Sequence, residues 1–414
     1  MDRIQSAAGL ATLILVTWLL SEKRGKVNPR IIAGCLFLQF SFAILFLKIP
    51  LFQDCFIYLS QAAKTLQESC LAGTRFAFGY VGGGDAPFNV SKPENLFVFA
   101  FQGLPMVLLI SALSSVLFYW KVLPKIVALV SRVLRGVTGV GGAVALGVSA
   151  NIFVGMVEAP LMIRPYIAKM NRSEIFTLMV SGMATVAGTV MFIYAIILEK
   201  AIHGAMGHIL VASVISAPAA ILVALVMVPG DAEKQEETQS FVPPENAKSS
   251  MDALAKGVDA GVKLLIGIVA MVIVMVALVH LVNAFLELIP SNEPLTFQRL
   301  LGWCMAPVVW LIGIPWSEAA AAGQLMGTKI VLNELIAYVD LAKLPPGVLS
   351  ERSRTIMLYA MCGFANFASL GIMIAGLRGI APEKEREILS LGPKSILAGV
   401  IATLMTGAIA GILT

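Results

Sequence analysis

Long apolar runs separated by short polar loops dominate the sequence. A helix needs about 20 predominantly apolar residues to cross the hydrocarbon core of a bilayer. Eight stretches approach or reach that length, and we predict a membrane-spanning helix in each. The predicted spans are Ala7–Leu20, Ile31–Leu47, Val98–Trp120, Phe176–Leu198, Ile209–Val228, Leu264–Leu288, Ile356–Leu377 and Ile396–Leu413.

Two further apolar stretches, Ala143–Ala168 and Leu301–Met326, are interrupted in the middle by Gly, Pro and an acidic residue. The distribution of Lys and Arg indicates how they run, since cytoplasmic loops carry an excess of both. The basic loops all fall on one face, with both termini outside, only if Ala143–Ala168 enters and leaves the bilayer on the same side. We therefore predict two re-entrant hairpins, the second entering from the opposite face.

Three other segments complete the predicted organisation. The run Ala7–Leu20 lacks a small-residue cleavage site and precedes a basic loop, so we interpret it as a retained span and not as a signal peptide. The polar stretch Gly230–Met251 predicts a linker on the cytoplasmic side between two membrane halves. Ile49–Asn95 is expected outside, with an interfacial helix over Gln53–Leu71.

Composition excludes the soluble classes of protein. Of 414 residues, 58% are hydrophobic and 13% are charged, and the mean hydropathy is +0.87, whereas about 25% of a soluble protein is charged. The net charge of +5 follows from the basic inner loops, so no nucleic-acid partner is expected. The five cysteines contain no CxxC pair and the three histidines form no ligand pattern, so we expect no cofactor.

The two halves of the chain share one plan: span, hairpin, span, span. Three spans separate the hairpins, so the halves face opposite ways, which is the inverted-repeat layout of secondary transporters. In each hairpin tip a glycine is followed within five residues by a glutamate, Gly155 by Glu158 and Gly313 by Glu318. Irregular backbone at membrane depth is tolerated only where it is buried or lines a cavity, so we expect the tips to meet near the midplane. Packing kinks are the alternative.

Predicted spans four and seven carry polar breaks of their own, at Ser181–Thr189 and Cys362–Ser369. Close packing of small residues explains the Gly and Ala in these breaks but not Asn366. A charge inside the membrane is costly and usually marks a pathway or a binding site. Glu158 is therefore the first candidate for a functional residue.

These motifs resemble the concentrative nucleoside transporter family, in particular its bacterial sodium-coupled symporters. The resemblance extends over nearly the whole chain, and its motifs are specific in combination. They are Ala150–Pro165 (ANIFVGMVEAPLMIRP), Gly73–Gly79 (GTRFAFG), Gly313–Ala319 (GIPWSEA), Asn333-Glu334 and Gly363–Ser369 (GFANFAS).

The resemblance implies an all-α polytopic protein with eight spans and two re-entrant hairpins. It also implies a homotrimer and an elevator-type movement of a transport domain against a scaffold. The corresponding segments are 1–120 (scaffold helices one to three with the external interfacial helix), 121–229 (interfacial helix, first hairpin, helices four and five), 230–250 (cytoplasmic linker), 251–290 (scaffold helix six) and 291–414 (second hairpin, helices seven and eight).

Carried over residue by residue, the resemblance implies a nucleoside site. Glu158 is expected to contact the nucleoside and Glu334 to accept the ribose hydroxyls, because carboxylates bind hydroxyl donors through charge-assisted hydrogen bonds. The alternative for Glu334 is a charge at the external mouth, paired with Lys329 or Lys343. The other implied contacts are Asn366 and Ser369 to the ribose, Phe364 as an aromatic wall, and Val190 against the base.

The sequence departs from the family at the residues just before Glu158. The family commonly has Gln-Thr or Gln-Ser there, and these polar side chains contact the nucleobase. This chain has Met156-Val157 instead. Apolar side chains cannot make those hydrogen bonds, so we expect the base to bind by shape, stacking or water, and the choice between purine and pyrimidine stays open.

The resemblance also implies a sodium site between the first hairpin tip and the broken span four. Its ligands are the Asn151 side chain, the Val154 carbonyl, the Thr185 hydroxyl and the Val186 carbonyl. All are neutral oxygens, which suit a hard cation. A proton needs a titratable group, and Asn151 is not one, so sodium is favoured over a proton as the coupling ion. Helix capping is the alternative for Asn151 and Thr185.

We therefore expect sodium-coupled symport of nucleosides across the cytoplasmic (inner) membrane, with proton coupling as the alternative. We expect no enzyme activity: Glu158 and Glu318 could form an acid–base pair, but they lie on oppositely entering hairpins without a nucleophile. Glu318 is equally open to a structural role at the start of a helix. A passive nucleoside channel or receptor is a further alternative. The expected partners are the nucleoside, the bilayer and further copies of the chain.

Overall fold

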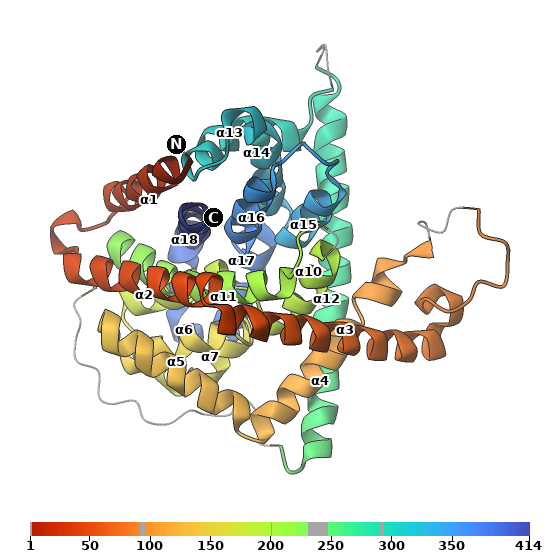
Figure 1. Ribbon diagram of the computed structural model, residues 1–414. Coiled ribbons are helices and arrows are strands. Elements are labelled where there is room, and N and C mark those ends of the chain that lie inside the picture. The colour runs from red at the N-terminus through yellow and green to blue at the C-terminus, as the bar shows by residue number, and fades with distance from the viewer. Residues whose placement is uncertain (1, 92–95, 200, 231–246, 290–293) are drawn as a thin grey trace.

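The computed structural model describes residues 2–91, 96–199, 201–230, 247–289 and 294–414 (Figure 1). Within these ranges the chain is built from helices, loops and one isolated β-bridge between Pro346 and Leu349. The predicted all-α class is confirmed. The predicted linker lies mostly outside the described residues.

Among the described residues, six helical segments are long and apolar enough to span a membrane. Each overlaps a predicted span, but the helices predicted to begin at Leu264 and Ile396 begin earlier, at Ser250 and Glu385. The remaining two predictions fall on shorter helices, α1 (Asp2–Leu19) and the pair α16 (Glu351–Met361) and α17 (Phe367–Ile380). The six are α2 (Pro29–Lys48), η4 with α4 (Phe99–Gly103, Met106–Tyr119), α9 with α10 (Arg172–Ala184, Gly188–Leu198), α11 (Ala205–Met227), α12 (Ser250–Leu286) and η5 with α18 (Pro382–Lys384, Glu385–Leu413).

The two stretches predicted as hairpins each fold back through a tight turn. The first contains α6 (Gly142–Asn151), α7 (Glu158–Met162) and α8 (Arg164–Ile167), and the second contains α13 (Phe297–Leu311) and α14 (Trp316–Val331). Both turns use a glycine with positive φ, +129° at Gly155 and +111° at Gly313, a conformation that other residues rarely adopt. The Gly–Glu pattern of the sequence therefore marks two real chain reversals.

α13 and α14 pack against each other in antiparallel fashion with very short separation. A Cβ on Gly327 would lie only 2.6 Å from Leu301 Cβ, and a Cβ on Gly302 would lie 3.2 Å from Gln324 Cα. Small residues let two helix backbones approach in this way, which strengthens packing where lipid supplies no hydrophobic driving force. The second hairpin is consequently a stiff unit.

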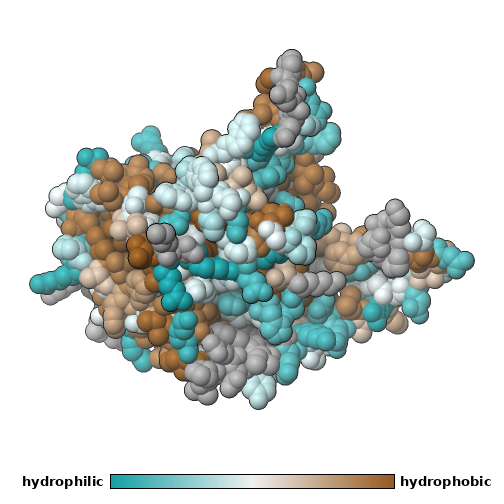
Figure 2. Space-filling view, turned by 45° about the horizontal axis from the view of Figure 1, so that its top comes forward, coloured by the Kyte–Doolittle hydropathy of each residue, from teal (hydrophilic) through white to brown (hydrophobic). Residues whose placement is uncertain are grey.

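α12 has a different environment from the central helices. Almost none of its apolar stretch is buried, whereas most of α11 and α18 is. It stands at the edge of the molecule and packs on α4, while α3 (Pro50–Phe78) runs crosswise to it (Figure 1). Hydrophobic residues cover much of the face shown in Figure 2. On α12 itself Ile266, Ile273 and Phe285 are exposed, as expected for a helix covered by lipid or another subunit.

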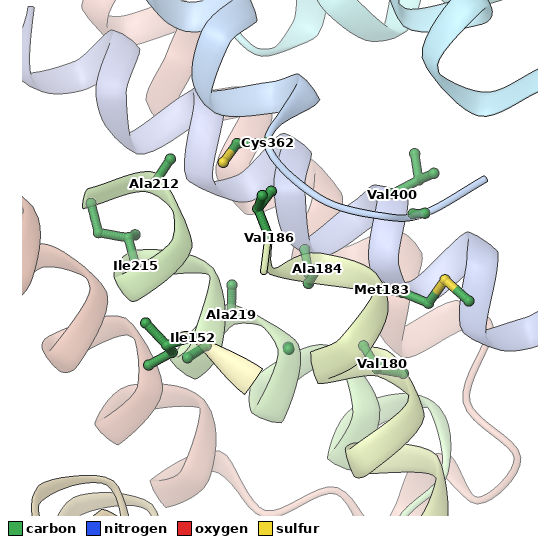
Figure 3. Packing of buried hydrophobic residues seen from close by; sticks show 14 of the residues in the cluster. Ile152, Val180, Met183, Ala184, Val186, Ala212, Ile215, Ala219, Cys362 and Val400 are labelled. Carbon is green, nitrogen blue, oxygen red and sulfur yellow. The ribbon is translucent and has the colours of Figure 1, made fainter. Parts of the chain in front are cut away.

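The core lies around the two interrupted helices. α9, α11 and α18 pack on one another, and Figure 3 shows Ala184, Val186 and Cys362 within this packing. A Cβ on Gly363 would lie 2.9 Å from the carbonyl oxygens of both Met183 and Ala184. The break between α9 and α10 therefore touches the break between α16 and α17, so polar backbone from both halves of the chain meets inside the protein.

A charged junction holds the loop after α1 against the ends of other helices. The Arg172 guanidinium donates to Glu22 over 3.0 Å, and the Lys394 ammonium also donates to this carboxylate. The Glu22 amide donates to the Met227 carbonyl over 2.9 Å. The hydrogen bonds from Arg172, and secondarily from Lys394, lower the pKa of Glu22 from 4.5 to about 2.

Candidate functional site

Glu334 forms the centre of a buried polar cluster, which we call the carboxylate cluster (Glu334, Tyr194 and Asn366). It is the first residue of α15 (Glu334–Lys343), whose N-cap Asn333 accepts from the Ile336 amide over 2.9 Å. The side chain is 4% exposed. Tyr194 OH on α10 donates to Oε1 over 2.6 Å, and Asn366 Nδ2 donates to Oε2 over 3.0 Å. Each carboxylate oxygen keeps acceptor capacity for a further donor.

Burial bears on the two sequence interpretations of Glu334. A charge at an external mouth would be exposed and paired with lysine, but Glu334 is buried and bonded to neutral donors. Lys343 is exposed, and the Lys329 ammonium has no hydrogen-bond partner among the described residues. An exposed mouth position and a pairing with Lys343 do not fit this burial, whereas a charge interaction with the equally buried Lys329 stays open.

Asn366 joins the carboxylate cluster to the break between α16 and α17. It is the N-cap of α17, and its Oδ1 accepts from the Ser369 amide over 2.8 Å while its Nδ2 serves Glu334. One side chain thus starts a half-helix and orients the carboxylate. Ser369 is buried beside it, and Phe364 is partly exposed in the same break.

The first hairpin places its tip against the α9–α10 break and against α17. Glu158 begins α7 and its side chain is exposed, which distinguishes it from the buried Glu334. Met156 packs on Gly182 of α9, where an added Cβ would lie 2.8 Å from Met156 Cβ. Val157 packs on Gly376 of α17, where the corresponding distance to Val157 Cγ1 is 3.2 Å. The departure from the family motif therefore lies in contact with helices from both halves.

A second buried set of polar atoms, which we call the oxygen cluster (Asn151, Ser181 and Thr185), joins the first hairpin to α9. Asn151 Nδ2 donates to Ser181 Oγ over 2.6 Å, and Thr185 Oγ1 lies 2.8 Å from the Ser181 carbonyl and 3.2 Å from the Asn151 carbonyl. Asn151 Oδ1 is buried without a hydrogen-bond partner among the described residues. A buried amide oxygen without a partner is costly, and a bound cation would satisfy it.

The other two residues of the expected ion site lie next to this cluster. Val186 is buried directly after Thr185 in the break, and its amide donates to Ser213 Oγ over 3.4 Å. Val154 is buried in the hairpin turn, whose neighbouring Phe153 carbonyl accepts from the Gly188 amide over 3.0 Å. The hairpin tip and the α9–α10 break are thus tied together by backbone and side-chain bonds.

The sequence interpretation overlooked two residues that the structure places in these clusters. Tyr194 follows the expected base contact Val190 by four residues, so both lie on one face of α10. Ser181 precedes Thr185 by four residues and lies one turn below it on α9. Helical spacing from a residue already singled out is the signal that would have found both. Glu318, by contrast, accepts from the Ser350 amide and hydroxyl over 3.2 Å each and lies in neither cluster.

A cavity of about 1390 Å³ is lined in part by α10 and α15, the helices that carry Tyr194 and Glu334. Its lining includes Ala195, Leu335 and Ile336, the residues that directly follow Tyr194 and Glu334 in the chain. The opposite walls come from α2, α3 and α12. Space for a small molecule therefore exists between these outer helices and the central bundle.

Comparison with known proteins gives consistent matches along the chain. The family models described as Na+ dependent nucleoside transporter N-terminus and C-terminus match residues 8–81 and 208–411, and a model described as nucleoside recognition matches residues 100–201. An uncharacterized transporter of Haemophilus influenzae is 36% identical, covering 100% of this chain and 98% of its own. The nucleoside permease NupC of Helicobacter pylori is 33% identical, covering 98% and 97%.

Solved structures agree with these matches. The structure of CNTnw in an inward-facing substrate-bound state superposes with a TM-score of 0.89 at 33% sequence identity. The alignment covers 100% of this chain and 98% of that one. The order of the helices, the two turned-back stretches and the two breaks therefore belong to an established architecture.

Proposed function

Because the chain belongs to the concentrative nucleoside transporter family, we propose that it takes up nucleosides by sodium-coupled symport across the cytoplasmic membrane. One observation carries the proposal: a buried carboxylate, Glu334, is oriented by Tyr194 and Asn366 and keeps acceptor capacity for donors that a sugar supplies. A ribose offers two adjacent hydroxyl donors. The carboxylate cluster is therefore assigned to the ribose.

The base is assigned to the space beside the first hairpin tip. Val190 lies one turn from Tyr194 on α10, and Phe364 lies in the break that contains Asn366. Glu158, exposed at the start of α7, supplies a second carboxylate for the nucleoside. Met156 and Val157 leave this part of the site without hydrogen-bonding side chains, so shape and stacking contribute more to base binding than polar recognition.

Sodium is assigned to the oxygen cluster together with the Val154 and Val186 carbonyls. The Asn151 Oδ1 atom supports the assignment, because it is buried without a hydrogen-bond donor in the described part of the chain and is therefore free to coordinate a cation. No member of the cluster titrates near neutral pH. Proton coupling would have to use Glu158 instead, and the experiment below separates the two.

Alternating access is assigned to an elevator movement in a homotrimer. The two turned-back stretches are proposed as re-entrant hairpins whose tips carry the site, as in other inverted-repeat transporters. The exposed apolar face of α12 is proposed as scaffold surface facing another subunit. Glycine contacts between α13 and α14 support the second hairpin moving as one body.

Uptake by the purified protein in liposomes tests the proposal. Radiolabelled adenosine and uridine are offered outside, with an inward sodium gradient or with potassium in its place. We expect accumulation above the external concentration with sodium only. Uptake that follows a pH gradient and ignores sodium would establish proton coupling, equilibration without accumulation would establish a channel, and no uptake of any nucleoside would refute the proposed function.

A further inference from the structure

Lys329 is a buried charge that the proposed nucleoside site leaves unexplained. It lies in the last turn of α14 and is 0% exposed. Its ammonium has no hydrogen-bond partner among the residues that the structure describes. Lysine is almost never fully buried unless it is paired, because taking an ammonium out of water costs much free energy. Packing alone therefore does not explain a lysine at this position.

The buried carboxylate that lies closest to Lys329 along the chain is Glu334, which is 4% exposed. α14 ends at Val331 and α15 begins at Glu334, so a turn of only two residues separates the helices. The turn ends at the N-cap Asn333, which fixes where the carboxylate enters the core. Lys329 and Glu334 thus stand on the two sides of one short, capped turn.

Among the described residues, Lys329 is the one buried lysine or arginine. The remaining titratable groups that act on the Lys329–Glu334 pair are Tyr194 from α10, Tyr338 from α15 and Cys362 from the break after α16. All three are neutral at physiological pH. Hence Lys329 is the cation best placed to offset the charge of the buried carboxylate.

We propose that Lys329 is a positioning residue that keeps Glu334 ionised, and so keeps it an acceptor for the ribose hydroxyls. The inference rests on the proposed function. It assigns to Lys329 an effect on a substrate-binding residue and no contact with the substrate. Lys329 acts through charge and does not touch the nucleoside.

The hydrogen bonds around Glu334 explain why ionisation matters. Tyr194 and Asn366 both donate to the carboxylate, and ribose hydroxyls would donate as well. A protonated Glu334 would carry a donor of its own, which would oppose one of these donors and leave fewer acceptor positions for the sugar. Without a nearby cation, burial favours that neutral form. Removing Lys329 should therefore weaken ribose binding while the apolar contacts to the base remain.

The test measures nucleoside uptake by Lys329→Met in liposomes between pH 6 and pH 9, against Lys329→Arg and the exposed-lysine control Lys263→Met. We expect KM for adenosine to rise about tenfold or more at neutral pH and to fall as pH rises, because alkaline pH restores the carboxylate. Lys329→Arg keeps the charge and should keep a flat pH profile. Dideoxyadenosine lacks both ribose hydroxyl donors, so its transport should show little change in KM.

A double variant guards against loss through misfolding. Lys329→Met added to Glu334→Gln should cost no more than Glu334→Gln alone, because the charge that needed compensation is gone. Losses that multiply, or a Lys329→Met protein with wild-type KM and a flat pH profile, would overturn the inference. A wild-type protein that transports no nucleoside would refute the proposed function instead, so the two failures are distinguishable.

Discussion

The oxygen cluster and the carboxylate cluster both interrupt an apolar interior, but they do so with different chemistry. Asn151, Ser181 and Thr185 are neutral and bond largely to one another, and one oxygen is left over. The carboxylate cluster holds a full charge that is offset by Lys329 and two donors. Neutral side chains can stay buried at moderate cost without a bound cation, whereas a buried charge needs permanent partners.

The two clusters also differ in where their residues come from. The oxygen cluster uses one hairpin and one half-helix within residues 151–185, so a short part of the chain can assemble it. The carboxylate cluster combines α10 of the first half with α15 and the α16–α17 break of the second. Only a chain with both halves folded together can present it. Four experiments test this contrast, beginning with the largest expected effect.

Removing the charge of the carboxylate cluster should have the largest effect. Glu334→Gln turns one acceptor into an amide donor that faces either Tyr194 OH or Asn366 Nδ2, both of which donate now. We expect adenosine uptake to fall about 100-fold or more, since one partner of a buried hydrogen-bonded charge pair is lost. Glu318→Gln, which lies outside both clusters, is the matched control. Near-normal affinity for adenosine in Glu334→Gln would contradict the assignment to the ribose.

Removing the leftover oxygen of the neutral cluster should alter sodium dependence more than nucleoside affinity. Asn151→Ala deletes Oδ1 and leaves the Ser181 hydroxyl without its donor. We expect the sodium concentration for half-maximal uptake to rise about tenfold, which corresponds to about 1.4 kcal/mol of binding free energy. Ser149→Ala, a buried residue that bonds only within α6, provides the comparison. An unchanged sodium curve would remove Asn151 from the ion site.

Restoring polar side chains at the hairpin tip should change specificity with a smaller effect on rate. The double variant Met156→Gln/Val157→Thr supplies hydrogen-bonding groups where this chain has none. We expect preference among competing nucleosides to shift toward pyrimidines by about three- to tenfold, the size of one added hydrogen bond. The ranking is measured by competition against labelled adenosine. If the ranking stays the same, these side chains do not contact the base.

Removing the partly exposed charge of Glu22 should have the smallest effect, and it provides a reference for the variants at buried positions. The Glu22 carboxylate keeps part of its surface exposed, so its ion pairs with Arg172 and Lys394 are screened. Because the folded pKa is lowered to about 2 from 4.5, this stability is present above pH 4.5 and is lost as pH falls toward 2. Glu22→Gln should lower the free energy of unfolding by about 1 kcal/mol or less at pH 7. A loss of several kcal/mol in thermal or denaturant unfolding would show that this junction is not screened.

Apolar runs alone were enough to predict α2 and α11, because the bilayer fixes the length of a spanning helix. They predicted only the later part of α12, which begins at Ser250 and not at the predicted Leu264. Polar residues inside such runs predicted the breaks at Thr185 and Asn366, since a half-helix end needs a cap and tolerates little else at that depth. These are local rules, and they worked where the determinants lie within one stretch of sequence.

Residues that act across the fold were harder to predict. Tyr194 lies in an apolar run, and nothing near it in the sequence indicates a polar role. It gains that role because its hydroxyl donates a hydrogen bond to Glu334, which is far away in sequence. Lys329 was considered as a surface partner for Glu334, but its burial depends on how α14 packs. The contacts of Met156 and Val157 with distant glycines could not be foreseen from spacing either, because each needs the other half of the chain in place.

Those two glycine contacts bear on how substrate range could change during evolution. Met156 and Val157 occupy space that exists only because Gly182 and Gly376 have no side chain. A larger residue at Gly182 would collide with Met156, and one at Gly376 would press on Val157, so we expect the loop and these two glycines to vary together. Exchange of base preference between relatives would then require a matched set of four positions. A variant library that randomises all four should yield more working transporters with new specificity than one confined to the loop.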